Sequence, residues 1–159
     1  MHKIETILTP IDFSENALKI AQAAAYVAGT FKAKLHLIFV IREFDDYSNF
    51  FVPPVNMLNL KEELLLSAQQ QMDTFIDQRR KKFEEAGVPE IKSEVLNGDV
   101  AEEIMNYAKA HNCDLIVMGT HGYKGFERIM FGSVAEKVVK NACCPVMTIN
   151  PYQEECEEQ

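Results

Sequence analysis

The sequence lacks the segments that would place the protein in a membrane or export it. It contains no run of about 18 apolar residues, the length that a membrane-spanning helix requires. The opening stretch, MHKIETILTPID, has neither the apolar core nor the cleavage site of a signal peptide, and it predicts a short strand instead. We therefore expect no membrane association and a cytoplasmic location.

The cysteines follow no disulfide or zinc-ligand spacing. Cys143 and Cys144 are adjacent, Cys113 follows a predicted helix, and Cys156 lies in a polar tail. A reducing compartment accounts for this usage. Because a disulfide between adjacent cysteines is strained, we expect Cys143 and Cys144 to be buried beside the last strand rather than joined as a redox pair.

Motifs of several enzyme classes are also missing. The sequence has no Walker A loop, no G-x-G-x-x-G, no G-x-S-x-G, no H-E-x-x-H and no evident acid–base pair of carboxylates. His121 stands in a loop, and His2, His36 and His111 have no metal-ligand spacing with it. We therefore expect no catalytic residue and no metal site built by protein side chains.

Positive charge is scarce. The chain has 16 Lys and Arg against 24 Asp and Glu, a net charge of −8, and such a surface disfavours general binding of DNA or RNA through a basic face. The basic run 79–82 is flanked by Glu84 and Glu85 on a predicted helix, which favours a solvated face. A small anionic ligand remains compatible, because backbone N–H groups can hold one.

What the sequence does contain is a regular alternation of strands and helices in a chain of 159 residues, enough for one domain. The predicted strands are 6–11, 34–41, 91–96, 115–118 and 145–149, and the predicted helices are 17–28, 59–86, 100–110 and 133–142. This order predicts a single-domain α/β fold, an open five-stranded parallel sheet with helices on both faces, over 1–150, followed by an acidic tail, 151–159.

Local signals predict where the helices begin and end. Ser14, Asp99 and Ser133 are candidate caps, and Gly29 should end the first helix. Residues 42–57, with two prolines and four aromatics, predict an irregular connection that is either a lid, a partner surface or a loop packed over the sheet edge. The apolar stripe of the long helix is interrupted by an arginine; it consists of Leu65, Ala68, Met72, Phe75, Arg79, Phe83 and Ala86.

Ligands in open parallel sheets bind beyond the carboxyl ends of the strands, where the strand order reverses. This rule selects the loops after Ile11, Ile41 and Met118. The third loop reads GTHGYKGFERIMFGSV and carries two basic residues, Lys124 and Arg128, against one acidic residue. Its glycines allow close approach of a ligand, and the helix that follows offers its N-terminus to phosphate.

Four residues of this loop, Gly119, Gly122, Gly132 and Ser133, form the pattern G-x2-G-x9-G-S. The pattern resembles the ATP-binding motif of the universal stress protein family. The resemblance covers nearly the whole chain, through ILTPIDFSENALKIAQAAAYVA, LHLIFVI and CDLIVMGTHGYKGFERIMFGSVAEKVVKNACCPVMTI. It implies a Rossmann-like sheet of order 3-2-1-4-5, similar to the adenine nucleotide alpha hydrolases, and a nucleotide-dependent sensor or regulator of the stress response.

The resemblance also implies a set of nucleotide contacts. Asp12 would lie near ribose and base, and Pro10 and Val40 would flank adenine, with Val40 backbone groups reading the base edge. The full implied set is Pro10, Ile11, Asp12, Val40, Met118, Gly119, His121, Gly122, Gly132, Ser133 and Val134, the last members forming a phosphate cradle. The implied ligand is ATP or AMP, with Mg²⁺ as a possible companion, and the implied assembly is a homodimer through Val146–Ile149.

Purely structural roles are also open for several of these residues. Asp12 could form only an Asx turn or a helix cap, and Ser133 could cap a helix while also facing phosphate. Family members usually have another residue, often Arg, at Lys124, and many carry His at Phe39. Two other functions also remain: a slow ATPase or adenylyl- or phosphoryl-transfer enzyme, by analogy of fold, and a nucleotide-free structural dimer.

Overall fold

A computed structural model describes residues 2–42, 54–121 and 132–152, with side chains described from residue 59 onward in the second of these segments. In chain order the elements are β1 (Thr6–Pro10), α1 (Ala17–Phe31), β2 (Lys34–Arg42), α2 (Pro54–Asp77), α3 (Arg80–Glu85), β3 (Ile91–Gly98), α4 (Val100–Ala110), β4 (Leu115–Gly119), α5 (Ser133–Asn141) and β5 (Val146–Ile149). The strands form one sheet of order β3-β2-β1-β4-β5, and all neighbours are parallel. The predicted fold class and strand order are confirmed.

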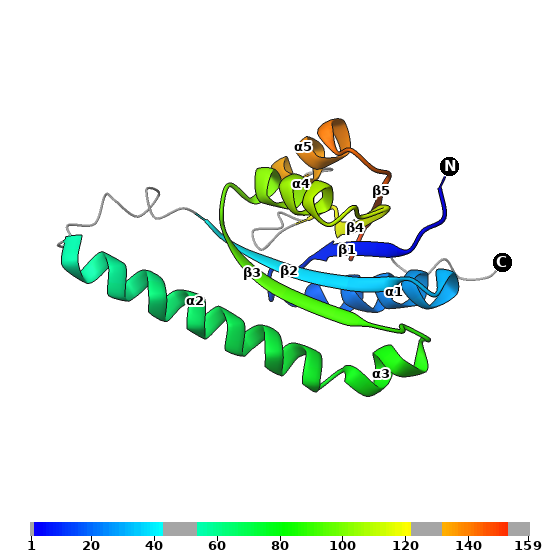
Figure 1. Cartoon of the computed structure of the whole chain (residues 1–159), viewed down its shortest axis with the longest axis horizontal. Helices are drawn as coiled ribbons and strands as arrows, with labels where there is room; N and C mark the ends of the chain where they lie inside the picture. The colour runs from blue at the N-terminus through cyan, green and yellow to red at the C-terminus, as the bar shows by residue number, and fades with distance from the viewer. Residues whose placement is uncertain (1, 43–53, 122–131, 153–159) are drawn as a thin grey trace.

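Helices cover both faces of the sheet. In Figure 1, α4 and α5 lie above it, and α1, α2 and α3 lie below it. Each face has its own core, one around Leu35, Leu37 and the α1 alanines and the other around Ile38, Ile104 and Ile116. Because alanine has a single methyl group, α1 can lie close to the sheet along its five fully or nearly fully buried alanines, Ala17, Ala21, Ala24, Ala25 and Ala28.

The prediction that Gly29 ends the first helix is wrong. Helix α1 continues to Phe31, and Lys32 ends it in the left-handed conformation (φ 54°, ψ 39°), with its N–H directed at the carbonyls of Ala28 and Gly29. Gly29 is needed for a different reason. A Cβ at this position would lie 1.7 Å from the carbonyl oxygen of Ala86, so glycine allows the end of α3 to touch α1.

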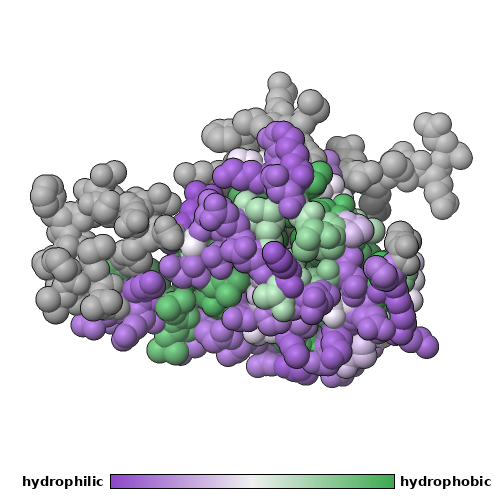
Figure 2. All heavy atoms as spheres, turned by 45° about the horizontal axis from the view of Figure 1, so that its top comes forward, coloured by the Kyte–Doolittle hydropathy of each residue, from purple (hydrophilic) through white to green (hydrophobic). Residues whose placement is uncertain are grey.

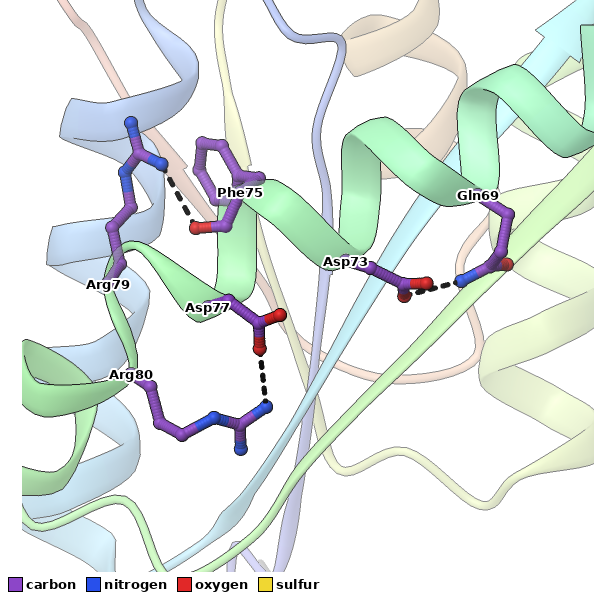
Figure 3. A network of polar contacts seen from close by, with 6 residues as sticks. All are labelled: Gln69, Asp73, Phe75, Asp77, Arg79 and Arg80. Atoms are coloured by element: carbon purple, nitrogen blue, oxygen red, sulfur yellow. Dashed lines mark hydrogen bonds and ion pairs between the residues drawn. The ribbon is translucent and has the colours of Figure 1, made fainter.

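The predicted single helix 59–86 is two helices. The chain already becomes helical at Pro54, inside the predicted irregular connection, and it breaks between α2 and α3 at Arg79. The Arg79 guanidinium lies 4.0 Å from the centre of the Phe75 ring and donates to the Phe75 carbonyl (3.0 Å), while the Arg79 N–H turns to Ile76. Figure 3 shows this side chain folded back on α2. The side chain therefore takes the place of a helical backbone bond, and α3 starts in a new direction that buries Phe83.

Two of the three predicted caps differ in the structure. Asp99 caps α4 as expected, because its Oδ1 accepts the Glu102 N–H at 3.0 Å. Ser14 does not cap α1, since the helix begins three residues later and the N-cap is Asn16. Ser133 is the first residue of α5 rather than its cap, which is Gly132 in an extended conformation. Helix α1 therefore begins two residues later than a Ser14 cap would place it, and α5 begins one residue earlier than a Ser133 cap would place it.

The surface carries mostly polar side chains. On the face shown in Figure 2, hydrophilic residues predominate and hydrophobic residues are exposed in separate patches. Cys143 is exposed and Cys144 half-buried, so the predicted burial of this pair is wrong for Cys143, which stands in the turn before β5 rather than beside it. None of the helices in the described segments is both long and apolar enough to cross a membrane.

Candidate functional site

The candidate site lies at the carboxyl ends of β1 and β4. Strand order reverses there, because β2 and β3 lie on one side of β1 and β4 and β5 on the other. Ile7 pairs with Leu115 and Leu8 with Ile116, so the same register continued brings Pro10 level with Met118. The Ile11 N–H donates to the Ile38 carbonyl (2.9 Å), which brings Val40 to the same edge. The predicted residues of three strands therefore share one end of the sheet.

The loop after β1 is fixed by its own backbone. Asp12 Oδ1 accepts the Ser14 N–H at 2.9 Å, so the Asx-turn reading of Asp12 is confirmed, and its other oxygen is left for a further contact. Phe13 has φ 58°, and its ring packs on Phe39 with centroids 4.8 Å apart. The Ser14 hydroxyl is buried and has no hydrogen-bond partner among the described residues. This turn therefore leaves one carboxylate oxygen of Asp12 without a bond to Ser14, at the carboxyl end of β1.

The loop after β4 is described up to His121 and again from Gly132. Gly119 lies close to α1, since a Cβ there would lie 2.4 Å from Ile20 Cδ1, the end of a side chain that would have to shift. Thr120 is buried, and its carbonyl accepts the Gly132 N–H at 2.8 Å. That bond closes the base of the loop and sets the start of α5 beside the end of β4. Gly122 lies outside the described residues.

The N-terminus of α5 faces this end of the sheet. The first bond of the helix runs from the Glu136 N–H to the Gly132 carbonyl, so the N–H groups of Ser133, Val134 and Ala135 have no partner within the helix. Ser133 is exposed, whereas the Val134 side chain packs on the core. Unpaired N–H groups and the helix dipole together favour an anion here.

A contact network that the sequence does not predict surrounds His121. Its Nδ1 lies 2.7 Å from the Thr120 hydroxyl, and its ring meets the Tyr152 ring edge-on, 5.2 Å between centroids. The Tyr152 hydroxyl accepts from Asn16 Nδ2 at 3.0 Å, and Lys19 donates to the Pro151 carbonyl at 2.9 Å. Residues 151 and 152, assigned to the tail from the sequence, therefore contact α1. No local sequence pattern predicts these contacts, because the residues are far apart along the chain and meet only in the folded structure.

The described residues hold no group of three or more His, Cys, Asp or Glu side chains placed to bind a metal ion. Asp12 is the one predicted site residue with a carboxylate. Mg²⁺ is often held by one or two carboxylates together with phosphate oxygens, and Asp12 offers one such carboxylate.

The universal stress protein family model matches residues 3–150, and the chain belongs to this family. Universal stress protein MJ0531 of Methanocaldococcus jannaschii is 39% identical over 150 residues, which cover 94% of this chain and 84% of that protein. Among solved structures, universal stress protein UspA from Lactobacillus plantarum has a TM-score of 0.78 and 28% identity, with 94% of this chain and all of that chain covered (100%).

Two further structures of the family share the fold at lower identity. A universal stress protein solved in complex with cAMP has a TM-score of 0.66 and 16% identity, covering 94% of this chain and 99% of that chain. The universal stress protein from Archaeoglobus fulgidus in complex with dAMP has a TM-score of 0.59 and 18% identity, covering 94% and 100%. These likenesses support the fold.

A second polar cluster is buried against the sheet under α4. His36 on β2 is 4% exposed, and its Nδ1 lies 3.2 Å from the Tyr107 hydroxyl, while the Tyr107 and His111 rings stack at 4.0 Å. Burial lowers the pKa of His36, helped by Lys92, and burial raises the pKa of Tyr107 to about 12. Both side chains are therefore neutral at pH 7, and His36 Nε2 has no partner among the described residues.

We expect the free energy of unfolding to fall as the pH drops below about 6.5, the usual histidine pKa. The unfolded chain then binds a proton at His36 that the folded chain does not, and stability decreases wherever the unfolded state holds more protons. Urea unfolding at pH 7.5 and 5.5 measures this, with the double variant His36→Leu/Tyr107→Phe as control. A double variant with the same pH dependence as the parent would show that His36 is not the group responsible.

Proposed function

We propose that this protein binds one adenine nucleotide, ATP or AMP, between the carboxyl ends of β1 and β4, and that binding regulates its interactions in the stress response. The main observation in support of this proposal is that the N-terminus of α5 and the turn after β1 lie at the point where the strand order reverses. Family membership and the structures solved with cAMP and dAMP support an adenine nucleotide as the ligand.

The residues divide between the parts of the nucleotide. Pro10, Ile11 and Val40 line the adenine end, where Val40 backbone groups face the base edge. Asp12 lies on the ribose side, with one oxygen free of the Ser14 N–H. Base recognition by backbone groups is consistent with Phe39 at a position where many family members carry histidine, since a side-chain change there leaves the backbone in place.

The phosphates lie over the start of α5. The N–H groups of Ser133 and Val134 donate to phosphate oxygens, while Met118 and Gly119 form the floor beneath them. Gly122 and His121 complete the set. The Gly132 N–H is engaged by Thr120, so Gly132 contributes space rather than a hydrogen bond. Where Mg²⁺ accompanies the phosphates, Asp12 and water would hold it, and the ion would neutralise part of the phosphate charge.

The output of binding is a change of conformation or partner rather than product formation. Asp12 Oδ1 already accepts the Ser14 N–H, and His121 is held by Thr120 and Tyr152, so both side chains have structural contacts of their own. Incubation with ATP and Mg²⁺ separates the alternatives. A sensor forms less than about one product equivalent per chain, whereas repeated turnover would identify an ATPase or transferase.

We also propose a cytoplasmic homodimer that pairs through β5. This strand ends the sheet and pairs only with β4 among the described strands, so its outer edge can accept a second strand. Met147 on β5 and Val139 on α5 are large apolar residues that are 39% and 46% exposed, which favours an apolar contact beside the paired edges.

The variant Met147→Lys is expected to convert this dimer to a monomer, because the contact would have to bury two lysines facing each other. Sedimentation velocity at matched concentrations measures the change. Tyr26→Lys is the matched control, since Tyr26 is 74% exposed on α1, away from β5. A parent protein that sediments as a monomer, or a Met147→Lys variant that remains dimeric, would contradict pairing through β5.

A further inference from the structure

Three cysteines converge where the chain enters β4 and β5, at the end of the sheet opposite the proposed nucleotide site. Cys113 lies two residues before β4 and Cys144 two residues before β5. The register pairs Ile116 with Val146, so the two cysteines reach the sheet almost level with each other on neighbouring strands. Both side chains lie on the same face, Cys113 within the core under α4 and α5 and Cys144 packed against it.

This placement suits a disulfide between Cys113 and Cys144. Neighbouring strands lie about 4.8 Å apart, and the Cα atoms of bridged cysteines lie about 4.4–6.8 Å apart. All three thiols are free in the structure. The third, Cys143, is exposed and precedes Cys144 directly along the chain. The cluster therefore combines one exposed, one half-buried and one buried thiol.

The environments of the three thiols differ in a way that sets their order of reaction. Burial raises the pKa of Cys113 to about 12 and that of Cys144 to about 11. Because the thiolate is the reactive form, the raised pKa makes Cys113 and the half-buried Cys144 poor first targets for an oxidant, and the burial of Cys113 also shields it from a solvent-borne oxidant. Cys143 is the entry point that remains.

We propose that Cys143, Cys144 and Cys113 form a peroxide-reactive thiol relay that ends in a disulfide between Cys113 and Cys144. In the first step the Cys143 thiolate attacks one oxygen of a hydroperoxide. A sulfur–oxygen bond forms, the oxygen–oxygen bond breaks, and the alkoxide leaves and takes a proton from water. Cys143 becomes a sulfenic acid, and the peroxide is reduced to an alcohol, or to water when the oxidant is hydrogen peroxide.

In the second step the Cys144 sulfur attacks the sulfenic sulfur of Cys143. The sulfur–oxygen bond breaks, hydroxide leaves with the Cys144 proton as water, and a disulfide joins the adjacent residues. In the third step the Cys113 sulfur attacks the Cys144 sulfur, Cys143 leaves as a thiolate, and the proton of Cys113 goes to it. Overall, two thiols lose two electrons and two protons, and one hydroperoxide accepts them.

The geometry favours the product of the third step over its reactant. A disulfide between adjacent residues is strained, whereas the bond between Cys113 and Cys144 spans neighbouring strands without that constraint. The leaving group, Cys143, is exposed, so its thiolate is solvated as it forms. The product ties the turn before β4 to the turn before β5, a link independent of the nucleotide site.

The test uses the full chain carrying Cys156→Ser, so that the tail thiol does not react. After exposure to hydrogen peroxide, free thiols are alkylated and the peptides are mapped by mass spectrometry. The relay predicts a linked pair of peptides containing Cys113 and Cys144. Added Cys143→Ser slows this bond by on the order of tenfold, and added Cys113→Ser stops the reaction at the bond between Cys143 and Cys144.

Added Cys144→Ser provides the matched control, because it keeps the entry thiol and removes the thiol that resolves it. It is expected to form no intramolecular disulfide and to accumulate a Cys143 sulfenic acid that dimedone traps. Circular dichroism establishes that each variant is folded before oxidation. Absence of the bond between Cys113 and Cys144 in the parent, or its formation at an unchanged rate in Cys143→Ser, would overturn the relay.

Discussion

The variant Gly29→Ala is expected to lose about 3 kcal/mol of the free energy of unfolding, the upper part of the usual range for overpacking. In an exposed helix interior the same change stabilises by about 1 kcal/mol, so the expected sign is reversed. The reason is the contact between α1 and the end of α3. An alanine Cβ would lie 1.7 Å from the Ala86 carbonyl oxygen and 2.7 Å from its carbon, and both atoms belong to the backbone, which cannot rotate away.

Urea unfolding of the parent, Gly29→Ala and Thr30→Ala measures this effect. Thr30 is the next residue of α1 and is exposed, and its hydroxyl bonds only to the Tyr26 carbonyl at 2.8 Å. Its replacement is expected to change the stability by less than about 0.5 kcal/mol. A Gly29→Ala variant as stable as Thr30→Ala would mean that α3 does not rest on α1 at this position.

The variant Gly132→Val is expected to weaken ATP binding by about 100-fold, which corresponds to about 2.7 kcal/mol. Gly132 has φ −63° and ψ 146°, a conformation that any residue can adopt, so the backbone does not require glycine here. A branched side chain at this position would occupy the space above the N–H groups of Ser133 and Val134. The same change should lower the stability of the unliganded protein by only about 1 kcal/mol, through a poorer N-cap.

Two control variants distinguish the effect of side-chain volume on ATP affinity from the effect of a lost hydrogen bond. Ser133→Ala removes a hydroxyl and keeps the backbone N–H, so ATP affinity is expected to fall by only a few-fold, about 1 kcal/mol or less. Gly132→Ala adds the smallest side chain and should give an intermediate loss. Calorimetry provides the affinities, and thermal unfolding without nucleotide shows that the variants are folded. Equal affinity of Gly132→Val and the parent would remove the start of α5 from the proposed site.

The sequence predicts the strands well because they are short, apolar and bounded by polar or glycine residues. The run 34–41 fills a strand paired on both sides, and β3, whose residues alternate, lies at the edge of the sheet. The cap of α4 by Asp99 also follows the local rule. These features depend on residues within a few positions of each other, which is the range over which sequence patterns are informative.

The two errors in the helices have different origins. Arg79 looks like an interruption of the apolar stripe of one helix, yet its side chain replaces a backbone hydrogen bond and divides the helix in two. Its partner, Phe75, is only four residues away, but the sequence pattern does not show which acceptor the guanidinium takes. Gly29 looks like a helix stop, yet it is a point of contact with Ala86, and that contact cannot be derived from neighbouring residues because it depends on the whole fold.

For the candidate site too, the sequence predicts some features and not others. Its strand-end members could be identified because the rule for parallel sheets needs only the order of elements. The contacts of Asn16 and Tyr152 around His121 could not, because 136 residues separate the first two along the chain. The close approach of Ile20 of α1 to Gly119 is a further contact that the sequence does not predict.

The most direct measurement of the central claim is a calorimetric titration of nucleotide-free protein with ATP and with AMP, in the presence and absence of Mg²⁺. Adenine nucleotide binding between β1 and β4 predicts saturable heat with a stoichiometry of about one nucleotide per chain, with an affinity about 100-fold weaker in Gly132→Val and reduced only a few-fold in Ser133→Ala. No saturable binding of either nucleotide up to millimolar concentration, or binding that Gly132→Val leaves unchanged, would contradict it.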